Sequence, residues 1–221
     1  MTERARECTV AVDYDGVYAN TIKCTTRSMM PAALRGGSVE RVATNVLFPI
    51  CENLKILKRG VESRTQAGSA GPVEINEPVR DLMTNYLNCG VEVIVLTSNS
   101  RPDFIRRVLD EEGMPDVDVR RTDRKAAYVR KYCDENPDRY MVLVDDSPSE
   151  ALRFVREFGI RPNNFIMFSN WHNEAVAFAL APVVRTAKAR TLDAEIKQAA
   201  CFAQEPCRVA DGFVADVAIA R

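Results

Sequence analysis

Apolar runs alternate with amphipathic segments through residues 8–12 and 76–169. The runs are almost continuously apolar, as expected of strands buried on both faces of a parallel sheet. They lie at residues 8–12, 91–97, 117–119, 139–145 and 163–169. Helical patterns occupy residues 76–90, 101–113, 123–136 and 147–159. Because strands alternate with helices of about 10–15 residues, the chain is predicted to form right-handed βαβ units. The predicted fold class is α/β, with a three-layer, doubly wound parallel sheet.

Two parts of the chain do not follow this alternation. Residues 17–73 contain one predicted helix, which begins after Ser38, and then a stretch over 61–74 whose Gly, Ser and Gln content predicts a loop. Residues 163–169 form the last strand that the pattern predicts. Beyond it, residues 171–182 and 186–204 are Ala-rich helix candidates, and residues 212–221 suit either a strand or a loosely packed tail. The sequence does not decide whether these C-terminal segments complete the core, contact another subunit or move freely.

The composition is that of an ordinary globular protein, since 46% of the 221 residues are hydrophobic, 28% are charged and the formal net charge is −1. No apolar run approaches the roughly 18 residues that a membrane-spanning helix needs, and the polar first residues do not resemble a signal peptide. We therefore expect a soluble, cytoplasmic protein with no membrane partner. The seven scattered cysteines are odd in number, which favours reduced thiols over a disulfide framework.

The presence of a single histidine, His172, excludes several classes of site. Metal sites built from several histidines are impossible, and a histidine-dependent hydrolase would need this one residue in a suitable context. We expect His172 to be structural. Cys133 and Arg139 have the C-x5-R spacing of cysteine-dependent phosphatases, but acidic residues dominate the segment between them. Such a segment does not suit a loop that binds a phosphate dianion. Neither glycine-rich nucleotide-binding motif occurs in the chain.

Polar side chains follow three of the predicted strands. They are Asp13 and Asp15, Thr97 and Ser98, and Asp145 and Asp146. In an open parallel sheet, ligands bind at the carboxyl ends of the strands, so we expect these groups to share one crevice. Converging carboxylates repel one another unless a cation neutralises them, and hard oxygen ligands favour Mg²⁺. An acidic crevice that holds a metal, with hydroxyl groups and a lysine nearby, is well suited to a phosphate ester.

Four motifs in this order resemble those of the haloacid dehalogenase-like (HAD) superfamily, in its phosphatase branch. The segment AVDYDG matches the D-x-D-G motif, and VIVLTSN matches the strand that ends in Thr or Ser. The third motif is a lysine at a helix start, for which Lys125 in TDRKAAYV is the better match and Lys131 the weaker one. VLVDDSPSEAL matches the acidic fourth motif, with DD in place of G-D. The resemblance covers roughly residues 8–168 and implies a HAD-like Rossmannoid core.

The resemblance implies a role for each matched residue. Asp13 would be the nucleophile that forms an aspartyl-phosphate, and Asp15 would protonate the leaving oxygen and later accept a proton from water. Thr97, Ser98 and Lys125 would bind the phosphoryl oxygens.

The resemblance also implies Mg²⁺ as the cofactor. The ion would be bound by the Asp13 carboxylate, the backbone carbonyl of Asp15 and Asp146, with Asp145 and Glu150 supporting. Dehalogenating relatives lack an acid at the position of Asp15, so its presence favours phosphate-ester hydrolysis.

In this family, segments inserted between the first two motifs form caps that select the substrate. We therefore expect a core of residues 1–21 and 74–181, a small, mostly helical cap over 22–73 and a C-terminal helical extension over 182–221. Residues 17–73 hold eight Lys and Arg against three acids, a balance of +5 that either steers anions to the site or solvates a helix face.

The leading hypothesis is a Mg²⁺-dependent phosphomonoesterase that acts on a small phosphorylated metabolite or nucleotide. One alternative is a nucleic-acid end phosphatase, which is the less favoured partner class because only Tyr18 and Phe48 in this region could stack on bases. The other is a non-catalytic binding or regulatory protein on the same fold. The sequence leaves the oligomeric state open.

Overall fold

The computed structural model of the chain describes residues 7–20, 74–99, 101–170 and 173–204. The cap predicted over 22–73, His172 and the segment 212–221 lie outside these residues. Among the described residues, no helix combines the length and the apolar character needed to cross a membrane.

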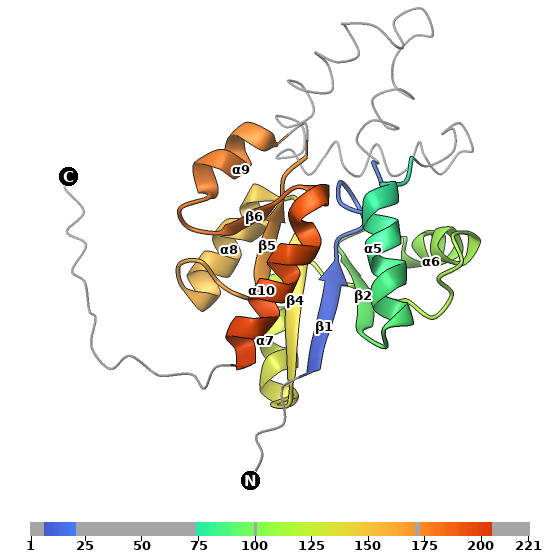
Figure 1. The fold of residues 1–221 in the computed structure, drawn as a ribbon, viewed down its shortest axis with the longest axis horizontal. Coiled ribbons are helices and arrows are strands. Elements are labelled where there is room, and N and C mark those ends of the chain that lie inside the picture. Colours follow the sequence, from blue (N-terminus) through green and yellow to red (C-terminus); the bar gives the residue numbers. More distant parts are fainter. Residues whose placement is uncertain (1–6, 21–73, 100, 171–172, 205–221) are drawn as a thin grey trace, which may run out of the picture.

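A six-stranded parallel sheet forms the centre of the described core (Figure 1). Its strand order is β3-β2-β1-β4-β5-β6, so the chain winds outward from β1 in both directions. The strands are β1 (Glu7–Val12), β2 (Glu92–Thr97), β3 (Asp118–Arg121), β4 (Arg139–Asp145), β5 (Phe165–Phe168) and β6 (Arg185–Ala187). The doubly wound parallel sheet predicted from the sequence is therefore confirmed. The central position of β1 places its carboxyl end at the point where the strand order reverses, which is where ligands bind in such sheets.

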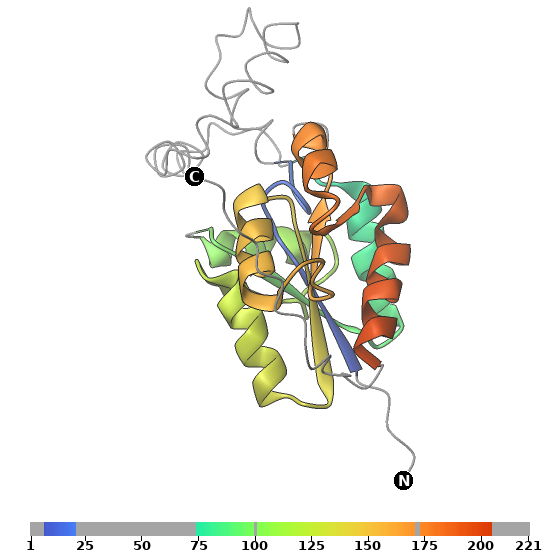
Figure 2. The ribbon, with the colours of Figure 1, turned by 90° about the vertical axis from the view of Figure 1, so that its left-hand side faces the viewer.

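Helices cover both faces of the sheet, as the three-layer prediction requires. They are α5 (Glu77–Asn88), α6 (Pro102–Glu111), α7 (Lys125–Glu135), α8 (Pro148–Phe158), α9 (Glu174–Leu180) and α10 (Leu192–Gln204), with a short 3₁₀ helix, η3 (Ala189–Thr191), before α10. Figure 2 shows α7 and α8 on one side of the strands and α5 and α10 on the other.

The alternation of side chains along β1 explains the two layers of the core. Val10 and Val12 belong to the apolar cluster that α5, α6 and α10 cover, whereas Ala11 belongs to the cluster under α7, α8 and α9. Successive side chains of a strand point to opposite faces, so an unbroken apolar run can fill both clusters at once.

The strand that follows residues 163–169 was not predicted, because the sequence pattern indicated a helix over residues 186–204. The helix α10 begins only at Leu192. Residues 185–187 form β6, which pairs in parallel with β5 over the register Ile166–Arg185 to Phe168–Ala187. The strand is only three residues long and two of them are polar or charged, so it carries no apolar run. In α10, Leu192, Ile196 and Ala199 are buried in the core, at helical spacing. The part of the predicted C-terminal extension that is described therefore completes the sheet and one of its layers.

Candidate active site

The carboxyl end of β1 delivers Asp13 to the middle of the sheet edge. The Asp13 amide donates to the Val144 carbonyl at 2.9 Å, which continues the pairing of β1 with β4 by one residue. The Tyr14 amide donates to Asp13 Oδ1 at 2.9 Å. These two backbone contacts fix both the main chain and one carboxylate oxygen of a side chain that is only 7% exposed. The other oxygen, Oδ2, has no hydrogen bond from the described residues.

Lys125 is a buried cation that joins two of the carboxylates. It begins α7 and is 4% exposed, and its Nζ lies 2.9 Å from Asp13 Oδ1 and 2.5 Å from Asp145 Oδ2. Burial alone would lower the pKa of Lys125, but the two carboxylates raise it above its usual value, so the ammonium stays charged. Lys131, the other lysine that the third motif allowed, is 72% exposed and pairs with Glu135 one helical turn further on. Of these two lysines, Lys125 is the one that reaches the strand ends.

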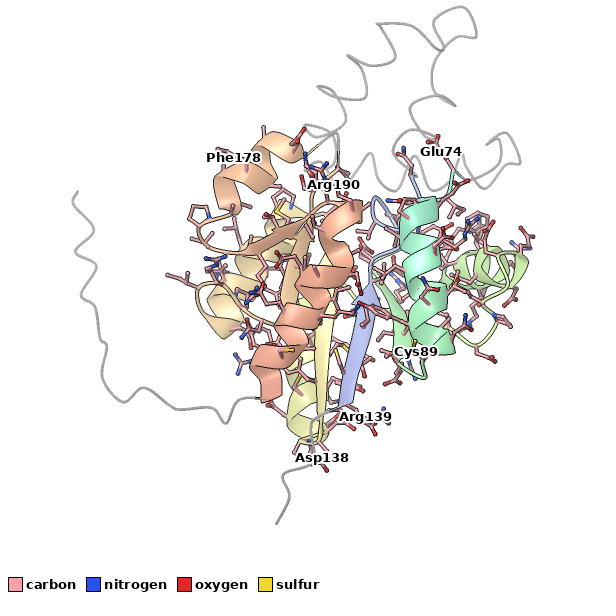
Figure 3. All side chains as sticks on the ribbon, in the orientation of Figure 1. Glu74, Cys89, Asp138, Arg139, Phe178 and Arg190 are labelled. Atoms are coloured by element: carbon pink, nitrogen blue, oxygen red, sulfur yellow. The ribbon has the colours of Figure 1, made fainter. Side chains whose placement is uncertain are left out.

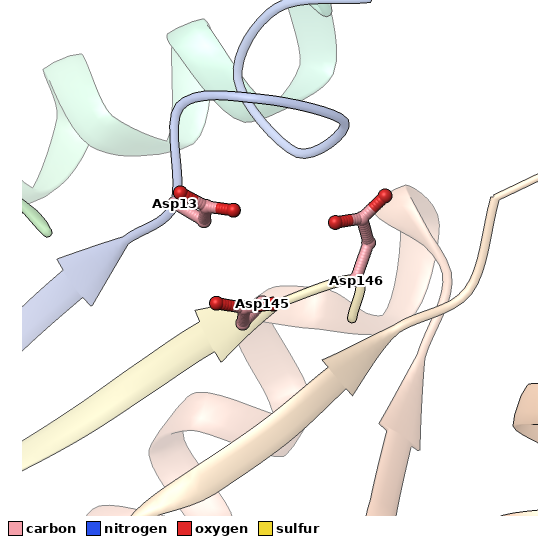
Figure 4. A group of neighbouring side chains, drawn as sticks. All are labelled: Asp13, Asp145 and Asp146. Carbon is pink, nitrogen blue, oxygen red and sulfur yellow. The ribbon is translucent and has the colours of Figure 1, made fainter. Parts of the chain in front are cut away.

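Three carboxylates meet at this edge of the sheet. Figure 4 shows Asp13, Asp145 and Asp146 directed toward a common space, and one oxygen of each lies within 4.8 Å of the others. Asp145 is fully engaged, because its Oδ1 accepts from the Ser147 amide at 2.8 Å and its Oδ2 from Lys125. Burial raises the pKa of Asp13 well above its ordinary value; Lys125 lowers it in part, and the neighbouring carboxylates raise it. This mutual repulsion is what a bound cation would relieve.

Gly16 allows the loop after β1 to approach Asp146. Its φ is +87°, and a Cβ at this position would lie 2.0 Å from Asp146 Oδ2. Asn170 bridges the loop and the carboxylate, because its Nδ2 donates to the Gly16 carbonyl at 3.0 Å and to Asp146 Oδ2 at 3.2 Å. Asn173, which is buried, fixes the backbone by donating to the carbonyls of Asp146 and Phe168 at 2.8 and 2.9 Å. Two asparagines that follow β5 thus hold the acidic end of β4 in place.

Asn99, two residues beyond the end of β2, contacts Asp15. Thr97 is fully buried, and its Oγ1 accepts from the Asn99 amide at 3.0 Å. Asn99 Nδ2 in turn donates to Asp15, at 3.1 Å from Oδ2 and 3.5 Å from Oδ1. Ser98 lies between Thr97 and Asn99 and is half-buried. The structure therefore brings Asp15 together with the Thr97–Asn99 loop.

Glu150 lies outside the carboxylate group. It is buried in the first turn of α8, one of its oxygens pairs with Arg153, and Oε2 is buried without a partner among the described residues. Burial raises the pKa of Glu150, Asp145 raises it further and Arg153 lowers it. Of the five residues expected to surround a metal, the structure gathers the side chains of Asp13, Asp145 and Asp146, and leaves those of Asp15 and Glu150 outside that group.

The donor set fits a magnesium ion. Carboxylate oxygens are hard ligands, and Mg²⁺ takes one or two carboxylates and keeps several waters. Asp13 offers an oxygen with no hydrogen-bond partner in the part of the chain that the structure describes, and Asp146 faces it across the space drawn in Figure 4. Asp145 has both oxygens occupied, which suits a residue that orients Lys125 better than a direct ligand.

The segment 21–73 leaves and re-enters the described core at adjacent points beside this site. The Asn20 amide donates to the Glu74 carbonyl at 2.8 Å, and Ala19 forms an antiparallel bridge with Ile75. Ala19 also forms a bridge with Asp15. Glu74 lies at the end of the molecule toward which β1 points, whereas Asp138 and Arg139 lie at the opposite end (Figure 3).

Solved structures share this fold. A predicted phosphatase from Clostridium acetobutylicum matches with a TM-score of 0.59 and 11% identity, over 88% of this chain and 100% of its own. A HAD family hydrolase from Deinococcus radiodurans R1, solved with bound phosphate and sodium, gives a TM-score of 0.53 and 13% identity, over 92% and 100%. A proposed β-phosphoglucomutase from Thermotoga maritima gives 0.53 and 17%, over 86% and 98%.

The chain therefore has the fold of the HAD superfamily, as the four motifs led us to expect. Identities this low show a shared fold and no more. No protein-family model matches the sequence, and no curated protein matches it either.

Three asparagines that shape the site were not among the residues selected from the sequence. They are Asn99, Asn170 and Asn173. Asn99 follows Thr97 and Ser98 directly, so its place at a strand end was a usable signal. Asn170 and Asn173 follow the apolar run at residues 163–169. That run is not followed by a pair of acidic or hydroxyl side chains, which was the signal used to select site residues at the other strand ends.

Proposed function

We propose that this protein is a Mg²⁺-dependent phosphomonoester hydrolase that acts through an aspartyl-phosphate. The observation that carries the proposal is the buried contact of Lys125 with both Asp13 and Asp145, next to Asp146. Lys125 and the Tyr14 amide occupy Asp13 Oδ1, which leaves Oδ2 to act as a nucleophile. A buried lysine that joins converging acids at the ligand-binding edge of the sheet is characteristic of a functional site.

In the first step, Asp13 Oδ2 would form a bond to phosphorus while the bond from phosphorus to the ester oxygen breaks. The electron pair of that bond leaves with the ester oxygen, which takes the proton of the Asp15 carboxyl group. Charge develops on the phosphoryl oxygens during this transfer. We assign the stabilisation of this charge to Lys125, Thr97 and Ser98.

In the second step, water would attack the aspartyl-phosphate. The new bond joins the water oxygen to phosphorus, the bond between phosphorus and Asp13 Oδ2 breaks, and Asp15 takes up the proton of the water. The products are an alcohol and inorganic phosphate, and both aspartates return to their starting states.

Asp13, Asp146 and the backbone carbonyl of Asp15 would hold Mg²⁺. When bound, the ion supplies charge neutralisation for the phosphoryl group and for the carboxylates around it. Asp145 would keep Lys125 in place, and Asn170 and Asn173 would keep Asp146 in place. We assign Glu150 a supporting role at the start of α8.

The substrate we propose is a small phosphorylated metabolite or nucleotide, handled by a protein of the cytoplasm. A phosphorylated nucleic-acid end is the alternative, and it would make substrate binding fall steeply with salt because many phosphate contacts release counterions. A metabolite phosphatase would show a much weaker dependence. Titrating KM against NaCl with a phosphorylated oligonucleotide and with a nucleoside monophosphate separates the two.

The deciding experiment compares p-nitrophenyl phosphate turnover by the parent and by Asp13→Asn, with Mg²⁺ and with EDTA. We expect loss of the nucleophile to lower kcat by roughly 10⁶-fold, as when the nucleophile of a serine protease is removed, and EDTA to abolish turnover by the parent. Asp138→Asn is the matched control, since this exposed acid lies at the opposite end of the sheet (Figure 3). Turnover by Asp13→Asn at the parent rate would refute the proposal, and a parent without turnover of any phosphate ester would leave a binding role on the same fold.

A further inference from the structure

The amide side chain of Asn99 is held at both ends. Its oxygen accepts from the Arg101 amide at 3.0 Å, and its nitrogen donates to Asp15, at 3.1 Å from Oδ2 and 3.5 Å from Oδ1. Its own backbone amide donates to Thr97 Oγ1 at 3.0 Å. A backbone N–H can only donate, so the contact with Arg101 identifies the oxygen of Asn99 and directs the NH₂ group at the carboxyl of Asp15.

Asp15 lies in a short loop after β1, and the hydrogen bonds within this loop join main-chain atoms. The loop is closed by the bonds from the Gly16 amide to the Ala19 carbonyl and from the Ala19 amide to the Tyr14 carbonyl, both at 2.8 Å. These bonds fix the main chain around Asp15. Within the described residues, Asn99 is the side chain that donates a hydrogen bond to its carboxyl group.

We propose that Asn99 is a positioning residue for the proton transfer by Asp15. The inference rests on the proposed function and adds to it the group that orients the acid. The contacts of the Asn99 amide with Oδ2 and Oδ1 fix the direction in which the Asp15 carboxyl group points.

The inference makes a prediction that depends on the leaving group. An alkoxide leaving group needs a proton during bond cleavage, whereas 2,4-dinitrophenolate leaves readily without one. A well-placed general acid contributes about 10²–10⁴-fold to a rate. Loss of the orienting contact should therefore slow the transfer of the phosphoryl group from an alkyl phosphate to Asp13 and spare its transfer from 2,4-dinitrophenyl phosphate.

The test measures kcat and KM for glycerol 1-phosphate and 2,4-dinitrophenyl phosphate with the parent, Asn99→Ala and Asn99→Asp, at saturating Mg²⁺. Asn99→Asp keeps the shape and the oxygen that accepts from Arg101 but places an acceptor against Asp15. We expect both variants to lose about 100-fold in kcat/KM on the alkyl ester and under threefold in kcat/KM on the aryl ester. The ratio kcat/KM reports the transfer to Asp13 and not the later attack of water, in which Asp15 would act on both esters alike. Asn99→Asp also serves if Asn99→Ala does not fold.

A double-mutant cycle separates positioning from a general weakening of the site. If Asn99 acts through Asp15, adding Asn99→Ala to Asp15→Asn should cost no further activity on the alkyl ester. Equal losses on both esters, additive losses in the cycle or full activity of both Asn99 variants would overturn this inference and leave the proposed function standing. A parent that hydrolyses neither ester would instead overturn the proposed function, and the inference with it.

Discussion

Replacing Gly16 by alanine tests whether the approach of the β1 loop to Asp146 matters for the site. The added Cβ would meet Asp146 Oδ2 at 2.0 Å and its Cγ at 2.6 Å, so the side chain or the loop must move by more than 1 Å. The φ of +87° adds strain of about 1–2 kcal/mol for a residue with a Cβ. Asn170 bonds both the Gly16 carbonyl and Asp146 Oδ2, so the carboxylate cannot turn away without losing that donor.

Two effects of different size should follow from this substitution. Strain alone would lower the free energy of unfolding by about 1–2 kcal/mol. A displacement of about 1 Å at a reacting centre can cost roughly 100-fold in rate, so we expect Gly16→Ala to lose about this much in kcat/KM. Because Asp146 is a proposed ligand, we also expect at least about tenfold weaker divalent-ion binding, as when the residues that orient metal ligands are lost.

Gly113→Ala is the matched control, since Gly113 has a φ of +79° and nothing within 4 Å of the added Cβ. It should show the same loss in urea unfolding with parental activity. The assays are urea denaturation, p-nitrophenyl phosphate turnover and Mn²⁺ titration by isothermal calorimetry. If Gly16→Ala matches Gly113→Ala in activity and Mn²⁺ affinity, the close approach to Asp146 has no functional meaning and the site is wrongly assigned.

Two further predictions concern buried groups. Lys125→Ala should lower the free energy of unfolding, measured in urea, by about 3–5 kcal/mol, because it leaves Asp13 and Asp145 buried without their cation. The control Lys131→Ala should change it by about 0.5 kcal/mol or less. Similar losses in the two variants would contradict the role of Lys125 as the buried partner of both carboxylates. Burial raises the pKa of Cys8 from 9.0 to about 11, so its thiolate fraction at pH 8 falls about 100-fold, and iodoacetamide should label it far more slowly than the exposed Cys89. Peptide mass spectrometry over time measures both cysteines, and equal rates would show that the partial burial of Cys8 does not protect its thiol.

The sheet could be predicted because its strands repeat one strong signal. Val10 to Val12 and Met141 to Val144 are buried on both faces, so each run reads as continuously apolar, and the intervening helices carry one apolar stripe. The sixth strand lacked this signal. At the edge of the sheet Arg185 and Thr186 remain partly exposed, so polar residues are tolerated there, and the strand forms through pairing with β5 rather than through burial.

The site was predictable to the extent that its residues follow strands. The acids after β1 and β4 and the hydroxyl groups after β2 could be placed together because parallel strands end at one edge. The role of Asn170 could not be predicted from the sequence, because its partners Gly16 and Asp146 lie 154 and 24 residues away in the chain. A hydrogen bond between such distant residues leaves no spacing to detect in one sequence, and asparagine is equally common in turns that bind nothing.

The formal charge around Asp13 relates the proposed metal to the proposed role of Asp15 as the general acid. Asp13, Asp15, Asp145 and Asp146 carry four negative charges when ionised, and Lys125 carries one positive charge, which leaves a formal −3 that would repel a phosphate ester dianion. A divalent cation held by Asp13 and Asp146 would reduce this to −1, and the proton that Asp15 must carry for the first step would reduce it to zero. The same proton would therefore reduce the repulsion of the phosphate ester and protonate the leaving oxygen. A donor from Asn99 to one oxygen of Asp15 suits that requirement, because it holds the group without supplying a charge that would oppose its protonation.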